Sequence, residues 1–371
     1  MSKPVNLRIP GPTPVPPDIL EAVGRPMVNH RGRDFAALIQ RVSERLKDFY
    51  QTRQDVLILT ASGTGGLEAA VVSTLSPGDK VLAVSIGSFG ERFAAIAEAY
   101  GAQVTMLPYD WGQAARPEDV SAALKDESDI KAVLVTHNET STGVTNPLEE
   151  IASVVRDAGK LLLVDAVSSL GAIPLAMDDW GLDVVVTGSQ KGWMVPPGLA
   201  FVSMSERGWK AHESARMPRF YFDLGRHRDS LVKGQTPWTP AMSIFFGLDV
   251  ALERMAEEGL ERIIARHARI AQMVRKGVKE LGLELLCRDE RFASDTVTAV
   301  KCPEGIDVSS LRNMMEDEYN VVIAGGQARL SGKIFRIGHL GLVSEEDIRE
   351  TLESLQQALG KLRFVLSGAR S

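Results

Sequence analysis

The sequence predicts an α/β protein: a large domain with a mostly parallel mixed sheet sandwiched by helices, followed by a smaller α+β C-terminal domain. Short apolar runs alternate with helical segments along most of the chain, and the pattern changes at about Leu260. The length of 371 residues also suits one large and one smaller domain. We therefore predict an N-terminal arm (1–20), a large domain (21–259) and a small domain (260–371).

The N-terminal arm comes first. Its segment Ile9–Pro17 is rich in proline, which fixes φ and removes backbone donors, so it forms neither a helix nor a central strand. We expect an extended arm that lies on a surface, with the surface of another subunit as one option. Apolar residues at helical spacing then predict a helix over Phe35–Phe49.

Strands and helices alternate after this helix. Apolar runs predict strands at Val56–Leu59, Lys80–Val84, Gln103–Leu107, Ala132–Thr136, Leu161–Val164, Val184–Thr187 and Leu199–Met204. Helices are predicted between most of them, at Phe89–Tyr100, Pro117–Leu124 and Leu148–Ala158. Ligands of such sheets bind beyond the carboxyl ends of the strands. Functional residues should therefore follow directly after a strand.

The C-terminal region has a different pattern. A long amphipathic helix is predicted at Leu260–Leu281, with its basic residues on a solvated face. Further apolar runs predict strands at Thr296–Val300, Val321–Ala324 and Ile334–Ile337, and helices at Val308–Asp317 and Glu345–Leu359. This mixture indicates a smaller α+β domain.

Composition excludes several classes of protein. A net charge of −6 and a pI near 5.7 argue against nucleic acid or an anionic membrane as the main partner. The two cysteines, Cys287 and Cys302, cannot form a disulfide framework or a Cys-based zinc site, and they suit a reducing cytosol. The first ten residues contain no long apolar stretch, so we expect neither a signal peptide nor a membrane anchor. The expected location is the cytoplasm.

Lys191 is the first candidate for catalysis. It follows the predicted strand Val184–Thr187 within a short turn that contains Gly188, Ser189 and Gln190. Burying a lone ammonium group is costly, whereas a lysine that forms a Schiff base must spend time uncharged. Considered alone, the motif fits either a Schiff-base lysine or a surface lysine in a turn.

Asp165 ends another apolar run, Leu161–Val164. A carboxylate at this position needs a partner, such as a metal, a ribose hydroxyl or the protonated pyridine nitrogen of pyridoxal phosphate. No accompanying His or Glu is evident, so we expect no metal. Val167 is placed to lie flat against a ring. A helix-capping aspartate is an equally good interpretation of this motif alone.

A third motif runs from Ser62 to Gly66, with Gly63 and Thr64 inside it, between a strand and a helix. Glycines and hydroxyl groups there expose backbone N–H groups to an anion at the start of the helix. The motif matches neither the dinucleotide fingerprint nor the Walker pattern. Considered alone, the motif fits a phosphate site and a plain connection between strand and helix equally well.

Taken together, the motifs resemble those of the fold-type I pyridoxal-phosphate enzymes, and within them the class V aminotransferases. The similarity is greatest to the serine–glyoxylate and alanine–glyoxylate aminotransferases. It extends over essentially the whole chain, through Pro10–Pro17, Asp110–Gln113, His137–Val144, Leu163–Ser169, Thr187–Lys191, Glu258–Glu261 and Phe335–Gly341.

This resemblance implies a role for each matching residue around a pyridoxal 5′-phosphate cofactor. Lys191 carries the cofactor as a Schiff base, and Asp165 holds the pyridine nitrogen. Ser62, Gly63, Thr64 and Gln190 hold the phosphate. The remaining ring contacts implied are Phe89 stacked on one face, Val167 on the other, and Thr140 near the ring oxygen.

The resemblance also implies contacts to substrate and to a second subunit. Arg336 fits a bidentate clamp for the substrate carboxylate. Thr236 and Thr239 fit a loop that reaches the phosphate of the neighbouring subunit in a homodimer. His30 and Arg31 resemble a substrate-side pair, although a simple surface role explains them equally well. We expect the other histidines His212, His227 and His267 to be exposed.

The implied activity is transamination of serine or alanine with glyoxylate, giving glycine and hydroxypyruvate or pyruvate by a ping-pong mechanism. Only Arg336 offers a carboxylate clamp, so we expect dicarboxylic substrates to be rejected. A pyruvate-linked aminotransferase and a non-catalytic cofactor-binding regulatory or structural subunit stay open. Neither cysteine is placed as the nucleophile that a cysteine desulfurase needs.

Overall fold

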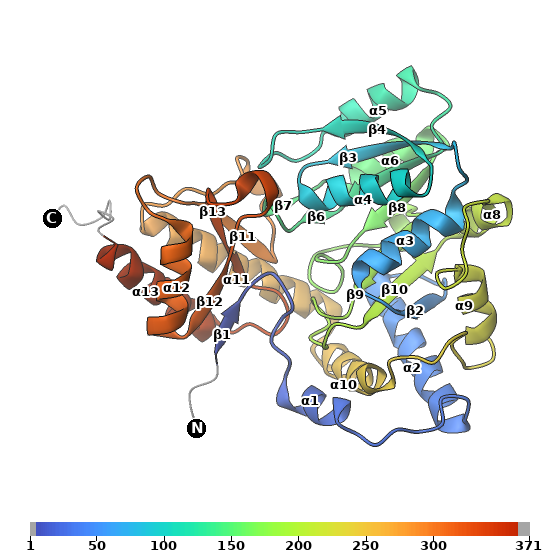
Figure 1. Ribbon diagram of the computed structural model, residues 1–371, viewed down its shortest axis with the longest axis horizontal. Helices are drawn as coiled ribbons and strands as arrows, with labels where there is room; N and C mark the ends of the chain where they lie inside the picture. The colour runs from blue at the N-terminus through green and yellow to red at the C-terminus, as the bar shows by residue number, and fades with distance from the viewer. Residues whose placement is uncertain (1–4, 363–371) are drawn as a thin grey trace.

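A seven-stranded mixed sheet forms the centre of the larger part of the protein (Figure 1). The structure is a computed structural model and describes residues 5–362. In spatial order the strands are β2 (Val56–Thr60), β10 (Leu199–Met204), β9 (Val184–Gly188), β8 (Leu161–Asp165), β5 (Ala132–Thr136), β3 (Lys80–Ser85) and β4 (Gln103–Pro108). Neighbouring strands from β9 to β4 are parallel, whereas β10 runs antiparallel to both β2 and β9.

Helices cover both faces of this sheet because successive side chains of each strand point to opposite faces. In β2, Ile58 enters one apolar core, and Leu57 and Leu59 enter the other. Packed on one face are α3 (Gly63–Thr74), α4 (Ser88–Ala99), α8 (Glu206–Ser214) and α9 (Leu224–Leu231). Packed on the other are α1 (Pro17–Val23), α2 (Arg33–Tyr50), α5 (Pro117–Asp126), α6 (Leu148–Asp157), α7 (Met177–Trp180) and α10 (Met242–Glu258).

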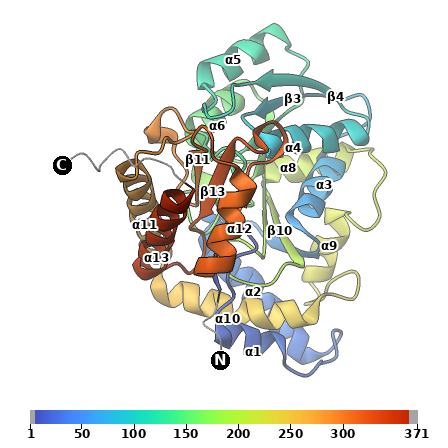
Figure 2. The same ribbon diagram turned by 60° about the vertical axis from the view of Figure 1, so that its left-hand side comes forward.

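The smaller part contains a four-stranded sheet with its own apolar core. Its strands in spatial order are β1 (Asn6–Arg8), β12 (Val321–Gly325), β13 (Ile334–Gly338) and β11 (Val297–Lys301). Its helices are α11 (Leu260–Glu280), α12 (Val308–Tyr319) and α13 (Glu345–Lys361), with the short 3₁₀ turns η1 (Glu290–Phe292) and η2 (Ala328–Leu330). Figure 2 shows α12 and α13 side by side in front of this sheet.

The predicted strands are confirmed to within one residue at each end, and the α/β fold class is confirmed as well. Three short strands were not predicted: β1, and the hairpin of β6 (Asn138–Glu139) and β7 (Val144–Thr145). Two or three residues give no readable alternation of side chains. Although β1 belongs to the predicted arm, it pairs in parallel with β12 of the small sheet, so both ends of the described chain meet there. The domain bounds stay a prediction.

Among residues 5–362, no helix combines the length and the apolar composition that crossing a bilayer requires.

Candidate active site

The carboxyl edge of the large sheet brings most of the predicted residues together. β3, β5, β8 and β9 are parallel, and β2 shares the direction of β9 because β10 is antiparallel to both. Their carboxyl ends therefore meet at one edge. The segments that follow them carry Ser62, Phe89, Thr140, Asp165 and Lys191.

Lys191 lies just beyond β9 and is largely removed from solvent. The pKa of its amine is lowered to about 8, mainly by burial; the Asp165 carboxylate opposes this, and the charges of Arg336 and Arg92 add to it. Its Nζ donates a hydrogen bond to the carbonyl oxygen of Pro10 at 2.6 Å. A substantial fraction of such an amine is neutral near pH 8, the form that attacks a carbonyl or accepts a proton.

The N-terminal arm covers this lysine within the same chain. Thr13 donates its backbone N–H to the carbonyl of Gln190 at 3.1 Å and its hydroxyl to the carbonyl of Lys191 at 3.0 Å. A Cβ atom added to Gly11 would lie 2.7 Å from the lysine Nζ. The arm thus lies on the site of its own subunit, and Pro10, Gly11 and Thr13 are site neighbours that the sequence did not indicate.

Asp165 ends β8 and is 4% exposed. Burial raises the pKa of its carboxyl to about 6, the Val167 N–H opposes this, and the negative charge of Glu139 adds to the rise. Oδ1 accepts the Val167 N–H at 2.9 Å, and Oδ2 has no hydrogen-bond partner among residues 5–362. A buried carboxylate with a free oxygen suits a cationic or N–H-bearing partner.

The predicted phosphate site Ser62–Gly66, called the phosphate cup below, lies at the first turn of α3. The hydroxyl of Ser62 caps this helix by accepting the Gly65 N–H at 3.4 Å. A Cβ on Gly63 would lie 2.7 Å from Val167. The predicted phosphate contact Gly63 and the predicted ring contact Val167 are therefore adjacent. A Cβ placed on Gly188 would lie 3.1 Å from Oε1 of Gln190 and 3.3 Å from the N atom of Gly63. That Oε1 is buried without a hydrogen-bond partner in the described part of the chain.

Thr64 is half-buried in the same turn of α3. The N–H groups at a helix start carry partial positive charge and bind anions. At Gln190 the amide oxygen and nitrogen can be exchanged by a flip, which would turn a donor toward such an anion. The turn therefore offers several donors around one point.

Arg336 is the predicted carboxylate clamp. Burial lowers the pKa of its guanidinium to about 10, although the nearby Glu139 opposes this. Its Nε donates to the carbonyl of Gly325 at 2.9 Å, and its Nη1 donates to the carbonyl of Thr140 at 3.0 Å. No carboxylate forms an ion pair with it among the described residues, so a buried guanidinium is held by neutral oxygens with donor capacity left over.

Thr140 connects this arginine to the sheet edge. Its hydroxyl donates to Oγ of Ser168 at 2.9 Å, and Ser168 follows Asp165 by three residues. Thr140 is thus fixed between Arg336 and the Asp165 loop. The predicted position of its hydroxyl near a ring oxygen stays a prediction.

Glu139 is a site residue that sequence reasoning did not single out. It is fully buried, and its Oε2 accepts the N–H groups of Phe89 and Gly90 at 3.0 and 3.1 Å. Its Oε1 accepts the N–H and the hydroxyl of Ser141. The carboxylate therefore joins the hairpin that carries Thr140 to the start of α4. An acidic residue inside the motif His137–Val144 was the available signal.

Four predicted residues do not reach Lys191 within one chain. Arg31 donates to the side chain of Gln235 and to the backbone of the loop that contains Thr236, and His30 is half-buried beside it. The Thr236 hydroxyl donates to the carbonyl of Trp238 at 2.7 Å, while Thr239 is exposed. Their assigned roles depend on a second subunit and stay predictions.

The prediction that His212, His227 and His267 are exposed was wrong: His212 is half-buried beside Asp223, and the other two are buried. His267 is fully buried in α11, where Nε2 accepts the Gly341 N–H at 3.2 Å. His227 in α9 is 5% exposed. Burial lowers the pKa of both rings to about 4, so both are neutral at pH 7. Each lies on the packed side of an amphipathic helix, which a single histidine in the sequence does not reveal.

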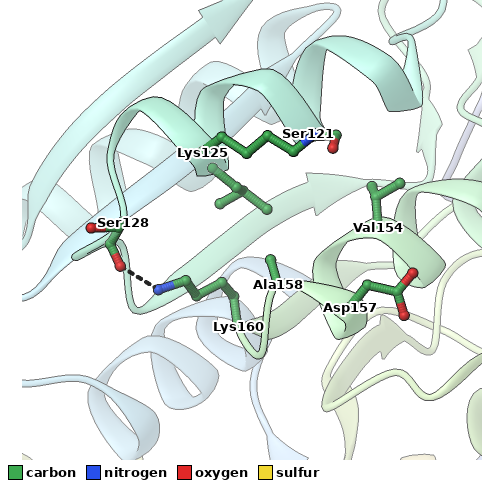
Figure 3. Close-up of a pocket in the computed structure, with 8 residues that line it drawn as sticks. Ser121, Lys125, Ser128, Val154, Asp157, Ala158 and Lys160 are labelled. Atoms are coloured by element: carbon green, nitrogen blue, oxygen red, sulfur yellow. Dashed lines mark hydrogen bonds between the residues drawn. The ribbon is translucent and has the colours of Figure 1, made fainter.

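A cavity of about 420 Å³ lies elsewhere, between α5 and α6 (Figure 3). Lys160, just before β8, donates to the carbonyl of Ser128 there at 2.6 Å. The cavity lies beside the amino end of β8, away from the end that carries Asp165, and none of the predicted site residues lines it.

The sequence pattern of the family described as aminotransferase class-V matches residues 11–339. The chain belongs to the class-V aminotransferases. The match begins at Gly11, directly after Pro10, and includes Asp165, Lys191 and Arg336.

Several relatives support this membership. The chain is 45% identical to the soluble hydrogenase small subunit of Synechococcus sp. (strain PCC 6716), with 96% of this chain and 94% of the relative covered. It is 41% identical to the L-aspartate–glyoxylate aminotransferase of Paracoccus denitrificans, covering 91% and 86%. It is 36% identical to the serine–glyoxylate aminotransferase of Methylorubrum extorquens, covering 95% and 90%.

Two solved aminotransferase structures have the same fold. Pyridoxamine–pyruvate aminotransferase from Mesorhizobium loti has a TM-score of 0.95 and 32% identity, covering 99% of this chain and 94% of that one. Ureidoglycine–glyoxylate aminotransferase from Bacillus subtilis has a TM-score of 0.93 and 30% identity, covering 100% and 96%.

Enzymes of this family depend on pyridoxal phosphate, and so does this class-V aminotransferase. The residues at the sheet edge fit that group. Lys191 offers a buried amine with a lowered pKa, and Asp165 a buried carboxylate with a free oxygen. The start of α3 and the unpartnered amide of Gln190 suit a phosphate.

Proposed function

We propose that this aminotransferase moves the amino group of serine or alanine to glyoxylate, giving glycine and hydroxypyruvate or pyruvate by a ping-pong mechanism. The observation that carries the proposal is the placement of Arg336. This buried guanidinium has no carboxylate partner in the described part of the chain, and its charge lowers the pKa of the Lys191 amine. A small α-amino acid bound by its carboxylate at Arg336 would then present its α-carbon to that amine.

Each residue around Lys191 would have a separate role in the reaction. When bound, pyridoxal phosphate supplies the electron sink that stabilises negative charge at the substrate α-carbon. Lys191 would hold the cofactor covalently at rest; its freed Nζ would accept the α-proton and return it later. Asp165, with a pKa near 6, is ionised at pH 7.5 and would keep a ring N–H protonated. Pro10 and Gly11 cover Nζ and limit access of water.

Glyoxylate is proposed as the acceptor because the names of relatives from several organisms share it, with aspartate, serine or ureidoglycine as the other named substrate. The test is a matrix of donors and acceptors with purified holoenzyme, using glyoxylate, pyruvate and 2-oxoglutarate as acceptors. Glycine should form fastest from glyoxylate with serine or alanine, with parallel double-reciprocal plots. A preference for pyruvate would establish the pyruvate-linked alternative instead.

Lys191→Ala provides the control for this assay. Borohydride should fix the cofactor to Lys191 in the wild type, and the variant should show neither this adduct nor amino transfer. An adduct at another lysine, with transfer retained, would remove Lys191 from its proposed role.

A second candidate is a non-catalytic subunit, favoured by the name of the Synechococcus relative. The chain has only two cysteines, fewer than the four thiolates that usually hold an iron–sulfur cluster. Lys191, Asp165 and Arg336 are all present at the sheet edge, which favours the enzyme. Failure of every donor to yield glycine would favour the subunit.

We also propose a homodimer in which the Thr236–Thr239 loop completes the site of the neighbouring subunit. Phe220 and Tyr221 are 61% and 40% exposed, and both stack on Trp238. This aromatic surface borders the phosphate cup, because Tyr221 also hydrogen-bonds the carbonyl of Thr60. Exposed apolar patches commonly mark interfaces. Sedimentation should give a dimer, and a fully active monomer would contradict the proposal. A cytoplasmic location stays a prediction from the cysteine content.

A further inference from the structure

α4 carries a guanidinium group that has no acidic partner among residues 5–362. Arg92 lies one turn after Phe89, and its Cζ lies 4.9 Å from the centre of the Phe89 ring. The side chain is exposed and forms neither an ion pair nor a hydrogen bond with any residue in 5–362. Its neighbour on the helix, Glu91, instead pairs with Arg329 of η2.

The charge of Arg92 is directed toward the reacting groups. It lowers the pKa of the Lys191 amine, just beyond β9, and also that of the Asp165 carboxyl at the end of β8. Burial has the larger effect on both pKa values, and the place of Arg92 at the site follows from its contact with Phe89. Phe89, on which it stacks, is itself held at the site by the Glu139 carboxylate.

Arg336 and Arg92, which both lower the pKa of Lys191, differ in environment. Arg336 is buried and fixed by the carbonyl groups of Gly325 and Thr140, which suits a constant substrate group. Arg92 is exposed, and its one cation–π contact among residues 5–362 is with the face of the Phe89 ring. Stacking on a ring leaves the edge N–H groups of a guanidinium free for bidentate bonding to a carboxylate.

We propose that Arg92 is a second anion subsite, which binds the side-chain carboxylate of a dicarboxylic amino donor while Arg336 binds its α-carboxylate. This inference rests on the proposed function and widens its donors to four-carbon acidic amino acids such as aspartate. It revises the expectation, drawn from the sequence, that dicarboxylic substrates are rejected. That expectation counted Arg336 as the single carboxylate-binding arginine. Arg92 was not considered because it belongs to none of the motifs that suggested the active site.

The test compares donors in the holoenzyme with glyoxylate as acceptor. The measured quantity is the ratio of kcat/KM for L-aspartate to kcat/KM for L-serine. Arg92→Ala should lower this ratio about 30-fold or more, the effect of losing a charge-assisted hydrogen-bonded pair. Arg92→Lys should lower it less, because a point charge replaces a planar fork. Arg116→Ala removes an exposed arginine on the loop before α5 and should leave the ratio unchanged.

A binding measurement separates this inference from the proposed function. Calorimetric titration of the wild-type holoenzyme should show tighter binding of succinate than of propionate, and Arg92→Ala should remove the difference. Equal binding of the two acids in the wild type would overturn the subsite, as would an Arg92→Ala variant with an unchanged aspartate-to-serine ratio. The subsite would also be overturned if Arg329→Ala lowered the aspartate-to-serine ratio of kcat/KM while Arg92→Ala left it unchanged. Absence of glycine formation from every donor would instead overturn the proposed function, while the succinate titration would still report on Arg92.

Discussion

The amine of Lys191 donates a 2.6 Å hydrogen bond to the carbonyl oxygen of Pro10, a residue 181 positions earlier in the sequence. The proline-rich arm is therefore part of the site of its own subunit. Its next residue, Gly11, has a φ of +127°, a conformation that residues with a side chain rarely adopt.

Gly11→Ala should disturb the site. The new Cβ would lie 2.7 Å from Nζ and 2.8 Å from Cδ of Lys191, and the backbone would be strained as well. We expect a loss of about 1–3 kcal/mol in the free energy of unfolding and a clear fall in cofactor trapped on Lys191 by borohydride, measured by mass spectrometry. Gly360→Ala, where the added Cβ meets no atom within 4 Å, is the control. Wild-type loading of Gly11→Ala would contradict this account.

Asp165→Asn should alter how stability depends on pH in the apoprotein. The carboxyl pKa rises from 3.8 in an unfolded chain to about 6 in the fold, so folding favours the protonated form. The wild type therefore loses about 3 kcal/mol from this group as pH rises from about 4 to about 6, whereas asparagine loses nothing. Urea unfolding measures the free energy of unfolding of both proteins at pH 4 and pH 7. Between these pH values, the difference between the variant and the wild type should shift in favour of the variant by about 3 kcal/mol.

The same variant in the holoenzyme should lose most of its turnover, since a neutral amide cannot stabilise a pyridinium charge. Asp126→Asn, at an exposed carboxylate of α5, supplies the background for the stability measurement. A pH-independent difference between Asp165→Asn and wild type would show that burial does not disfavour the charge of Asp165.

Glu139→Gln should separate α4 from the hairpin. An amide has a single acceptor oxygen, so it cannot accept from Phe89, Gly90 and Ser141 together, and its NH₂ group would face donors. We expect a loss of about 2–4 kcal/mol in the free energy of unfolding from the unsatisfied groups. Glu98→Gln, exposed on the same helix, should change stability by less than about 0.5 kcal/mol. Similar stability of the two variants would mean that the Glu139 contacts are unimportant.

Arg336→Lys should weaken the binding of every carboxylate substrate. Lysine cannot donate to Gly325 and Thr140 while also presenting a planar fork to a carboxylate. KM should rise roughly 10- to 100-fold for both donor and acceptor, with a smaller change in kcat. Steady-state kinetics with alanine and glyoxylate would measure both values. A change in KM for only one of the two substrates would show that they use different clamps.

Local sequence determined the elements and the chemistry at the ends of strands. The runs that became β8 and β9 are apolar and end in Asp165 and in the turn before Lys191, so both strands and both candidates could be predicted from adjacent residues. The cup at Ser62 was predictable for the same reason. Helix starts and strand ends are set by neighbours within a few positions.

Tertiary structure alone decided which distant residues meet. Arg336 donates to Thr140 across 196 positions, and Pro10 covers Lys191 from the far end of the chain. The burial of Glu139, and the direction in which Arg92 leaves α4, have no signal in hydrophobic periodicity. A period specifies which face of an element is buried, whereas the partner on that face depends on how the sheets and helices pack. That packing brings the charges of Arg336 and Arg92 close enough to Lys191 to lower the pKa of its amine, which the sequence by itself could not show.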